Sequence, residues 1–258
     1  MTTTEGRRPT RPHRRHRRRR RAVAVVAAVA VLGAGVWGLR AWRLHGQVER
    51  YRRYWSVPRG QPGGLVYVAL GDSSAQGIGA SEPELGYVGL LAARLRAATG
   101  QPVQVVNLSR SGARVRDVVD DQLPALAGLR PDLVTVTVGA NDLGRYQRAR
   151  FRADVDELLA GLPPNTVIGD VPWFMHGGAG RNSGEAAEWL AARAAERDLA
   201  VAGLHEAMRR RGWLSMATDF AADWFHLSDR GYRVWVGEFW GALQGSPALA
   251  VLTRRGAA

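Results

Sequence analysis

The chain has 258 residues, of which 46% are hydrophobic, enough to build one sizeable core in one or two domains. It has no cysteine, which excludes disulfides, thiolate catalysis and cysteine metal sites. Fifteen arginines and two glutamates in residues 1–53 account for the whole net charge of +13. The charge therefore indicates nothing about a substrate of the remaining chain.

The N-terminal segment has the pattern of a membrane anchor. Residues 1–21 hold ten arginines and almost nothing apolar, a composition typical of disorder. Residues 22–39 carry no charge, and as a helix they would cover roughly 27 Å, close to the hydrocarbon thickness of a bilayer. Trp37 and Trp42 lie where an interfacial aromatic belt would be. We expect a single transmembrane helix over 22–39 and a juxtamembrane linker over 40–64, part of which, from Leu44 onward, is alternatively a short helix.

Two other interpretations of this segment stay open. A basic arm for nucleic acid would not need an uncharged run behind it, so no nucleic-acid partner is expected. A cleavable signal peptide is favoured by the small residues of Gly33–Gly35, although its apolar core is usually only about 7–15 residues. The excess of arginine before the span predicts a cytoplasmic N-terminus and an extracytoplasmic domain; cleavage of residues 1–35 would instead give a secreted protein.

From Leu65 onward, predicted strands alternate with predicted helices. Apolar, β-branched runs predict strands over residues 65–70, 103–108, 133–138 and 166–171, with a weaker one over 200–204. A final helix is expected over about 229–243, with Ser228 as its N-cap. The alternation predicts an α/β fold, a three-layer α/β/α sandwich with a mostly parallel sheet over 65–244, followed by a C-terminal tail over 245–258.

Polar residues follow the first three predicted strands. Ser73 comes after the first, the segment 107–112 after the second, and Asn141 with Asp142 after the third. Because the carboxyl ends of parallel strands meet at one edge of a sheet, these groups should be neighbours. Asp223 and His226, just before the final helix, add the acid and the base that serine chemistry needs. No histidine spacing typical of a metal site occurs, so no metal is expected.

Four short motifs stand in a fixed order along the chain. They are Gly71-Asp72-Ser73 with Gly77, then Gly112, then Gly139-Ala140-Asn141-Asp142, and finally Asp223 with His226. In this order they resemble the conserved blocks of the SGNH hydrolase superfamily, also called GDSL esterases and lipases. The resemblance spans roughly residues 65–243 and implies a flavodoxin-like α/β fold and an esterase that needs no cofactor.

The resemblance also implies a role for each motif residue. Ser73 would be the nucleophile, His226 the general base, and Asp223 the acid that orients the imidazole. The oxyanion would be bound by the backbone N–H groups of Ser73 and Gly112 and by the side-chain amide of Asn141.

Three aromatic residues are candidates for the substrate-binding walls: Trp173, Phe174 and Trp224. Ordinary packing explains such large side chains equally well. We expect a membrane-anchored serine esterase that acts on a small-molecule, lipid or glycan ester. An acyltransferase or deacetylase acting on a glycan, and a non-catalytic binding domain with the same fold, remain alternatives. Acyl chain length, the alcohol of the substrate and the oligomeric state do not follow from the sequence.

Overall fold

The computed structural model describes residues 46–175 and 177–255, together with the single positions 23, 27, 35 and 38. The chain divides into two units, Met1–Arg43 and Leu44–Ala258. The disordered segment and the membrane helix predicted over 1–39 lie outside the described residues, apart from those four positions. Within the described part of the chain, no helix has both the length and the apolar character needed to cross a bilayer.

A six-stranded sheet forms the centre of the second unit. Its strand order is β1-β3-β2-β4-β5-β6. Every neighbouring pair is parallel except β1 with β3, which confirms the predicted α/β fold with a mostly parallel sheet. The strands are β1 (Arg59–Gly60), β2 (Leu65–Gly71), β3 (Val103–Asn107), β4 (Leu133–Thr137), β5 (Thr166–Gly169) and β6 (Ala200–Ala202).

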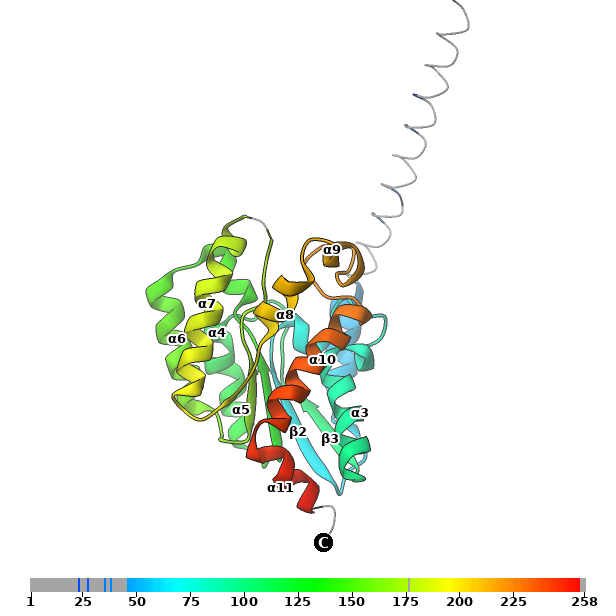
Figure 1. Cartoon of the computed structure of the whole chain (residues 1–258). Helices are drawn as coiled ribbons and strands as arrows, with labels where there is room; N and C mark the ends of the chain where they lie inside the picture. The colour runs from blue at the N-terminus through cyan, green and yellow to red at the C-terminus, as the bar shows by residue number, and fades with distance from the viewer. Residues whose placement is uncertain are drawn as a thin grey trace, which may run out of the picture. The chain divides into compact units, whose positions relative to one another are not determined.

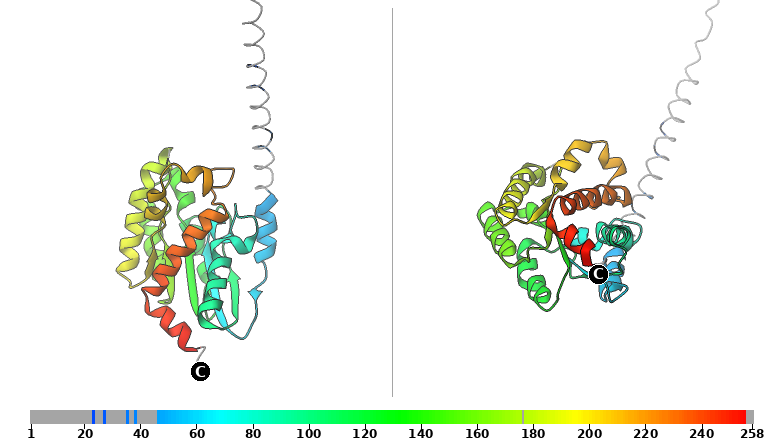
Figure 2. Two further views of the ribbon diagram at one scale, coloured as in Figure 1. Left: turned by 45° about the vertical axis from the view of Figure 1, so that its right-hand side comes forward. Right: turned by 60° about the horizontal axis from the view of Figure 1, so that its bottom comes forward.

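The sheet has a hydrophobic core on each face. Along β2, Tyr67 and Ala69 belong to one core, whereas Val68 and Leu70 belong to the other, because successive side chains of a strand point to opposite faces. Helices α3 (Tyr87–Thr99), α10 (Asp229–Gln244) and α11 (Pro247–Arg255) cover the first face. Helices α6 (Arg148–Gly161) and α7 (Gly177–Ala195) cover the second (Figure 1). Figure 2 shows the same two helical layers from other sides.

Shorter helical segments occupy the connections. After β2 come α2 (Ser73–Gln76) and η1 (Pro83–Leu85). The helical connection after β3 is divided into α4 (Val115–Asp117), the π-helical η2 (Val118–Gln122) and α5 (Leu123–Ala127). Pro124, which has no N–H to donate, lies at the last junction. The others are η3 (Ala140–Arg145), α8 (Leu204–Arg211) and α9 (Ser215–Thr218).

The domain is longer at both ends than the predicted range of 65–244. In the predicted linker over 40–64, residues 46–55 are helical, and the side chains of Tyr51 and Trp55 are buried in the core. Four residues apart, they lie on one helix face, which packs against the domain. In the predicted tail over 245–258, α11 packs against the same core through the buried side chain of Leu252.

Candidate active site

Ser73 lies at the turn between the central strand β2 and the short helix α2. The side chain of Asp72 caps this helix by accepting the backbone N–H of Ser74 at 2.8 Å. Gly71 precedes it with a φ of +133°, and a Cβ there would lie 2.0 Å from the carbonyl oxygen of Thr137. The glycine thus lets the chain turn directly against β4, and the turn holds Ser73 at the carboxyl edge of the sheet.

Three side chains form a continuous chain of hydrogen bonds at this edge. The Oγ of Ser73 lies 2.8 Å from Nε2 of His226, a residue 153 positions later. The Nδ1 of the same imidazole lies 2.5 Å from Oδ2 of Asp223. When Nδ1–H donates to the carboxylate, Nε2 is left to accept the proton of the hydroxyl. This arrangement can activate a serine for attack on a carbonyl carbon.

The carboxylate of Asp223 is stabilised in its charged form. Burial raises the pKa of Asp223, but the side-chain and backbone hydrogen bonds of His226 and the backbone N–H of Phe225 outweigh burial, so the net pKa lies below its usual value. The group is therefore ionised at neutral pH, where its charge can stabilise an imidazolium.

The loop that carries Asp223 and His226 is fixed at its base. The N–H of Ala221 donates to the carbonyl of His226 at 2.8 Å, and an isolated bridge joins Phe220 to Leu227. The fully buried carboxylate of Asp219 forms ion pairs with Arg211, the last residue of α8, and with Arg230 of α10 at 3.2 Å. These contacts join the loop to two helices.

Three potential oxyanion donors are neighbours. Ser73 is the first residue of α2, so its N–H has no intrahelical acceptor. Gly112 has a φ of +82°, and the space beside its Cα is open. The amide Nδ2 of Asn141 donates to the carbonyl of Ala113 at 3.0 Å and lies 3.5 Å from Oδ2 of Asp72. These contacts hold Asn141 between the loop of Gly112 and the turn of Ser73.

The three predicted aromatic residues line two adjoining hollows, one of which also borders Ser74, the residue after Ser73. Trp173 and Phe174 line a narrow apolar cleft together with Ser74. With Trp224 they also line an adjoining cavity of about 200 Å³. Phe225, which the sequence did not single out, stacks on Phe174 with ring centroids 5.5 Å apart. The acyl part of a bound ester would therefore contact an aromatic surface.

The family comparison agrees with this geometry. Residues 69–234 match the family model described as the GDSL-like Lipase/Acylhydrolase family. The chain belongs to this family. As a GDSL-family protein it is a hydrolase that acts on ester bonds. A search of the curated proteins found no match.

Solved structures share the fold of this GDSL-family chain. An α/β hydrolase from the metagenome of Lake Arreo, Spain, is 24% identical, with a TM-score of 0.58 over 70% of this chain and 95% of that one. A variant of the acetyl xylan esterase of Geobacillus stearothermophilus is 20% identical, with a TM-score of 0.58 over 71% and 96%. The esterase EstA of Pseudoalteromonas sp., solved inhibited by monoethylphosphonate, is 18% identical, with a TM-score of 0.54 over 70% and 97%.

Two buried amides of the GDSL-family site were not predicted. Gln122 donates to the carbonyl of Gly71 at 2.9 Å and accepts its N–H at 2.8 Å. Gln76 donates to the carbonyl of Ser109 at 3.0 Å and accepts the hydroxyl of Ser111 at 2.5 Å. They hold the loops after β2 and β3 in place. Of the two, only Gln76 could have been singled out from the sequence, because it is a polar residue between Ser73 and Gly77 of the first motif.

No metal site accompanies these residues. Within residues 46–175 and 177–255, no group of three histidine, aspartate or glutamate side chains is placed to hold a metal ion.

Proposed function

We propose that the protein is a serine esterase that cleaves carboxylic esters through an acyl-enzyme on Ser73. The observation that carries this proposal is the hydrogen-bonded chain from Ser73 Oγ through the imidazole of His226 to the carboxylate of Asp223, with distances of 2.8 and 2.5 Å. The match to a family of ester hydrolases supports it.

Each group has a defined chemical task in this mechanism. The Oγ of Ser73 attacks the ester carbonyl while Nε2 of His226 takes the hydroxyl proton. The negative charge that develops on the carbonyl oxygen is met by the N–H groups of Ser73 and Gly112 and by the amide of Asn141. When the tetrahedral intermediate collapses, His226 returns the proton to the leaving alcohol. Water then repeats the sequence and releases the acid.

To bind the oxyanion, the amide of Asn141 must give up its weak contact with the carboxylate of Asp72. One of its N–H groups is used by the carbonyl of Ala113 at 3.0 Å, while the contact to Oδ2 of Asp72 is long, at 3.5 Å. A developing oxyanion is a stronger acceptor at a shorter distance, so it would replace this second contact. The bond to Ala113 would then keep the amide oriented.

Turnover of p-nitrophenyl butyrate tests the proposal. Ser73→Ala and His226→Ala should each lower kcat by about 10³-fold or more, because the hydroxyl and its base act as a unit. Asp223→Asn should have an effect of similar order, since it favours the wrong tautomer of the imidazole. Ser56→Ala is the control and should retain wild-type rates, because Ser56 is exposed and its hydroxyl bonds the nearby carbonyl of Arg53. Wild-type turnover by Ser73→Ala would refute the proposal.

We also propose, from the sequence pattern, that residues 22–39 anchor the esterase in the cell membrane with its catalytic domain outside the cytoplasm. The uncharged run and the arginines before it support this proposal. The full-length chain should stay in the membrane fraction after extraction at alkaline pH with residues 1–39 intact by N-terminal sequencing. Recovery of a soluble chain that begins after residue 35 would show cleavage instead.

A further inference from the structure

A cavity of about 240 Å³ at the catalytic edge of the sheet is lined by four arginines. They are Arg114, Arg116, Arg145 and Arg150, and the acidic residues of the lining are Asp142 and Asp154. All six belong to the segments that follow β3 and β4. These segments leave the carboxyl ends of their strands, the edge of the sheet that also carries Ser73.

This arginine cavity is built on the two loops that carry oxyanion donors. Arg114 is two residues after Gly112, and Asp142 directly follows Asn141. The two loops are joined by hydrogen bonds from Asn141 Nδ2 to the carbonyl of Ala113 at 3.0 Å and from the N–H of Val115 to Asp142 Oδ2 at 3.2 Å. The cavity is therefore lined by residues next to Gly112 and Asn141 in the chain.

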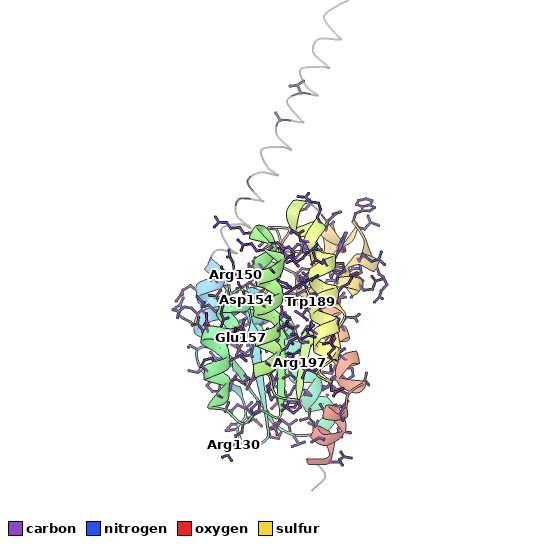
Figure 3. All side chains as sticks on the ribbon, turned by 90° about the vertical axis from the view of Figure 1, so that its left-hand side faces the viewer. Arg130, Arg150, Asp154, Glu157, Trp189 and Arg197 are labelled. Atoms are coloured by element: carbon purple, nitrogen blue, oxygen red, sulfur yellow. The ribbon has the colours of Figure 1, made fainter. Side chains whose placement is uncertain are left out.

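Two of the four guanidinium groups are already neutralised. Arg116 pairs with Asp120 at 2.6 Å, with Glu157 at 2.5 Å and with Asp154 at 3.5 Å. Arg150 lies 3.7 Å from Asp154, and Figure 3 shows Arg150, Asp154 and Glu157 in succession along α6.

The other two guanidinium groups have no such partner. Among the residues that the structure describes, neither Arg114 nor Arg145 has a carboxylate oxygen within 4.0 Å. Both are exposed to solvent; Arg114 lies near enough to the carboxyl of Asp142 to oppose the rise that burial causes in its pKa, and both guanidinium groups still have N–H groups to offer an anion. A guanidinium binds phosphate, sulfate and carboxylate through paired N–H groups.

We propose that the arginine cavity is a subsite for an anionic group, such as a phosphate, carried on the alcohol side of the ester substrate. The apolar cleft borders Ala140 and the arginine cavity borders Asp142, the two chain neighbours of Asn141. An ester whose carbonyl oxygen is bound at Asn141 thus has an aromatic surface on one side for its acyl chain and exposed guanidinium groups on the other for its alcohol. This inference rests on the proposed esterase function.

A matched substrate pair tests the subsite. The full-length esterase should hydrolyse 1-butyrylglycerol 3-phosphate with a kcat/KM about tenfold higher than 1-butyrylglycerol. The double variant Arg114→Gln, Arg145→Gln should abolish this preference by raising KM for the phosphate ester while changing kcat/KM for the neutral ester less than about twofold. Arg130→Gln is the control, because Arg130 is also exposed but lies at the opposite end of the domain (Figure 3).

Inorganic phosphate supplies a second readout. It should inhibit hydrolysis of the neutral ester by the wild type and not by the double variant. Equal inhibition of both, equal kcat/KM for the two wild-type substrates, or a preference that survives in the double variant would overturn the subsite. Mono-p-nitrophenyl succinate differs from p-nitrophenyl butyrate by a carboxylate on the acyl part. If the enzyme preferred an anionic substrate only in this pair, the assignment of the subsite to the alcohol part would be overturned. Absence of turnover of every ester would refute the esterase function instead.

Discussion

Asp72 adjoins the proposed nucleophile but takes no part in the hydrogen-bonded chain to His226. Its carboxylate is almost fully buried, caps α2 through the N–H of Ser74 and faces the amide of Asn141. Burial raises the pKa of Asp72 to about 6, although the N–H of Ser74 opposes the shift. The unfolded chain loses this proton near pH 4, so between about pH 4 and 6 the folded state binds more protons than the unfolded one.

This protonation difference makes stability depend on pH with a definite sign. The free energy of unfolding of the wild type should fall relative to that of Asp72→Asn as pH rises from about 4 to 6, by on the order of 2 kcal/mol, and the difference should level off above that window. Urea unfolding at a series of pH values measures it. Asp121→Asn, at an exposed carboxylate, is the control. Parallel curves for wild type and Asp72→Asn would contradict the buried, protonated carboxyl.

At the scale of the elements, the segment after α2 contacts the loop that carries Asp223 and His226, and the contact lies at Gly79. This residue has a φ of +94°, and a Cβ there would lie 2.4 Å from the carbonyl oxygen of Leu227 and 2.9 Å from Cβ of His226. The close approach lets the two segments bring Ser73 and His226 within hydrogen-bonding distance. Gly100, after α3, also has a positive φ, +68°, but open space around it.

Alanine variants of these two glycines distinguish the effect of backbone strain on stability from the effect of displacing the loop of His226 on activity. Gly100→Ala should destabilise the fold by about 1–2 kcal/mol, since it places an alanine in the left-handed region, and Gly79→Ala should destabilise it more, because its Cβ would also collide with the carbonyl oxygen of Leu227. Only Gly79→Ala should also lower kcat, by about tenfold or more, because a shift of about 1 Å misaligns the imidazole. Urea unfolding and p-nitrophenyl butyrate turnover measure the two effects. An unchanged kcat in Gly79→Ala would show that the close approach does not position His226.

At the scale of the whole molecule, the sequence predicted the central sheet more accurately than the ends of the domain. The strand around Val68 is apolar without interruption over residues 65–70, as expected of a strand covered on both faces, so its position followed from composition. A short helix before the domain was one of two possibilities for residues 44–64, but its packing was not predicted, because Tyr51 and Trp55 stand among arginines and before a Pro- and Gly-rich stretch that resembles a linker. Only packing against the domain shows that they are core residues.

The candidate site was likewise predicted only in part. Ser73 and Asn141 could be placed at one edge, because a parallel sheet gathers the ends of its strands there, whereas the roles of the motif residues followed from the family resemblance. The arginine cavity could not be predicted, since which guanidinium groups are paired depends on tertiary contacts such as that of Arg116 with Glu157, 41 positions away. Local sequence carries no information about such contacts.

Covalent labelling of the full-length protein tests the central claim most directly. A fluorophosphonate probe reacts with a serine hydroxyl that a neighbouring base activates. Peptide mass spectrometry should find one probe adduct, on Ser73, and labelling should disappear in Ser73→Ala and fall strongly in His226→Ala. An adduct on another serine, or labelling of Ser73→Ala equal to that of the wild type, would contradict the account.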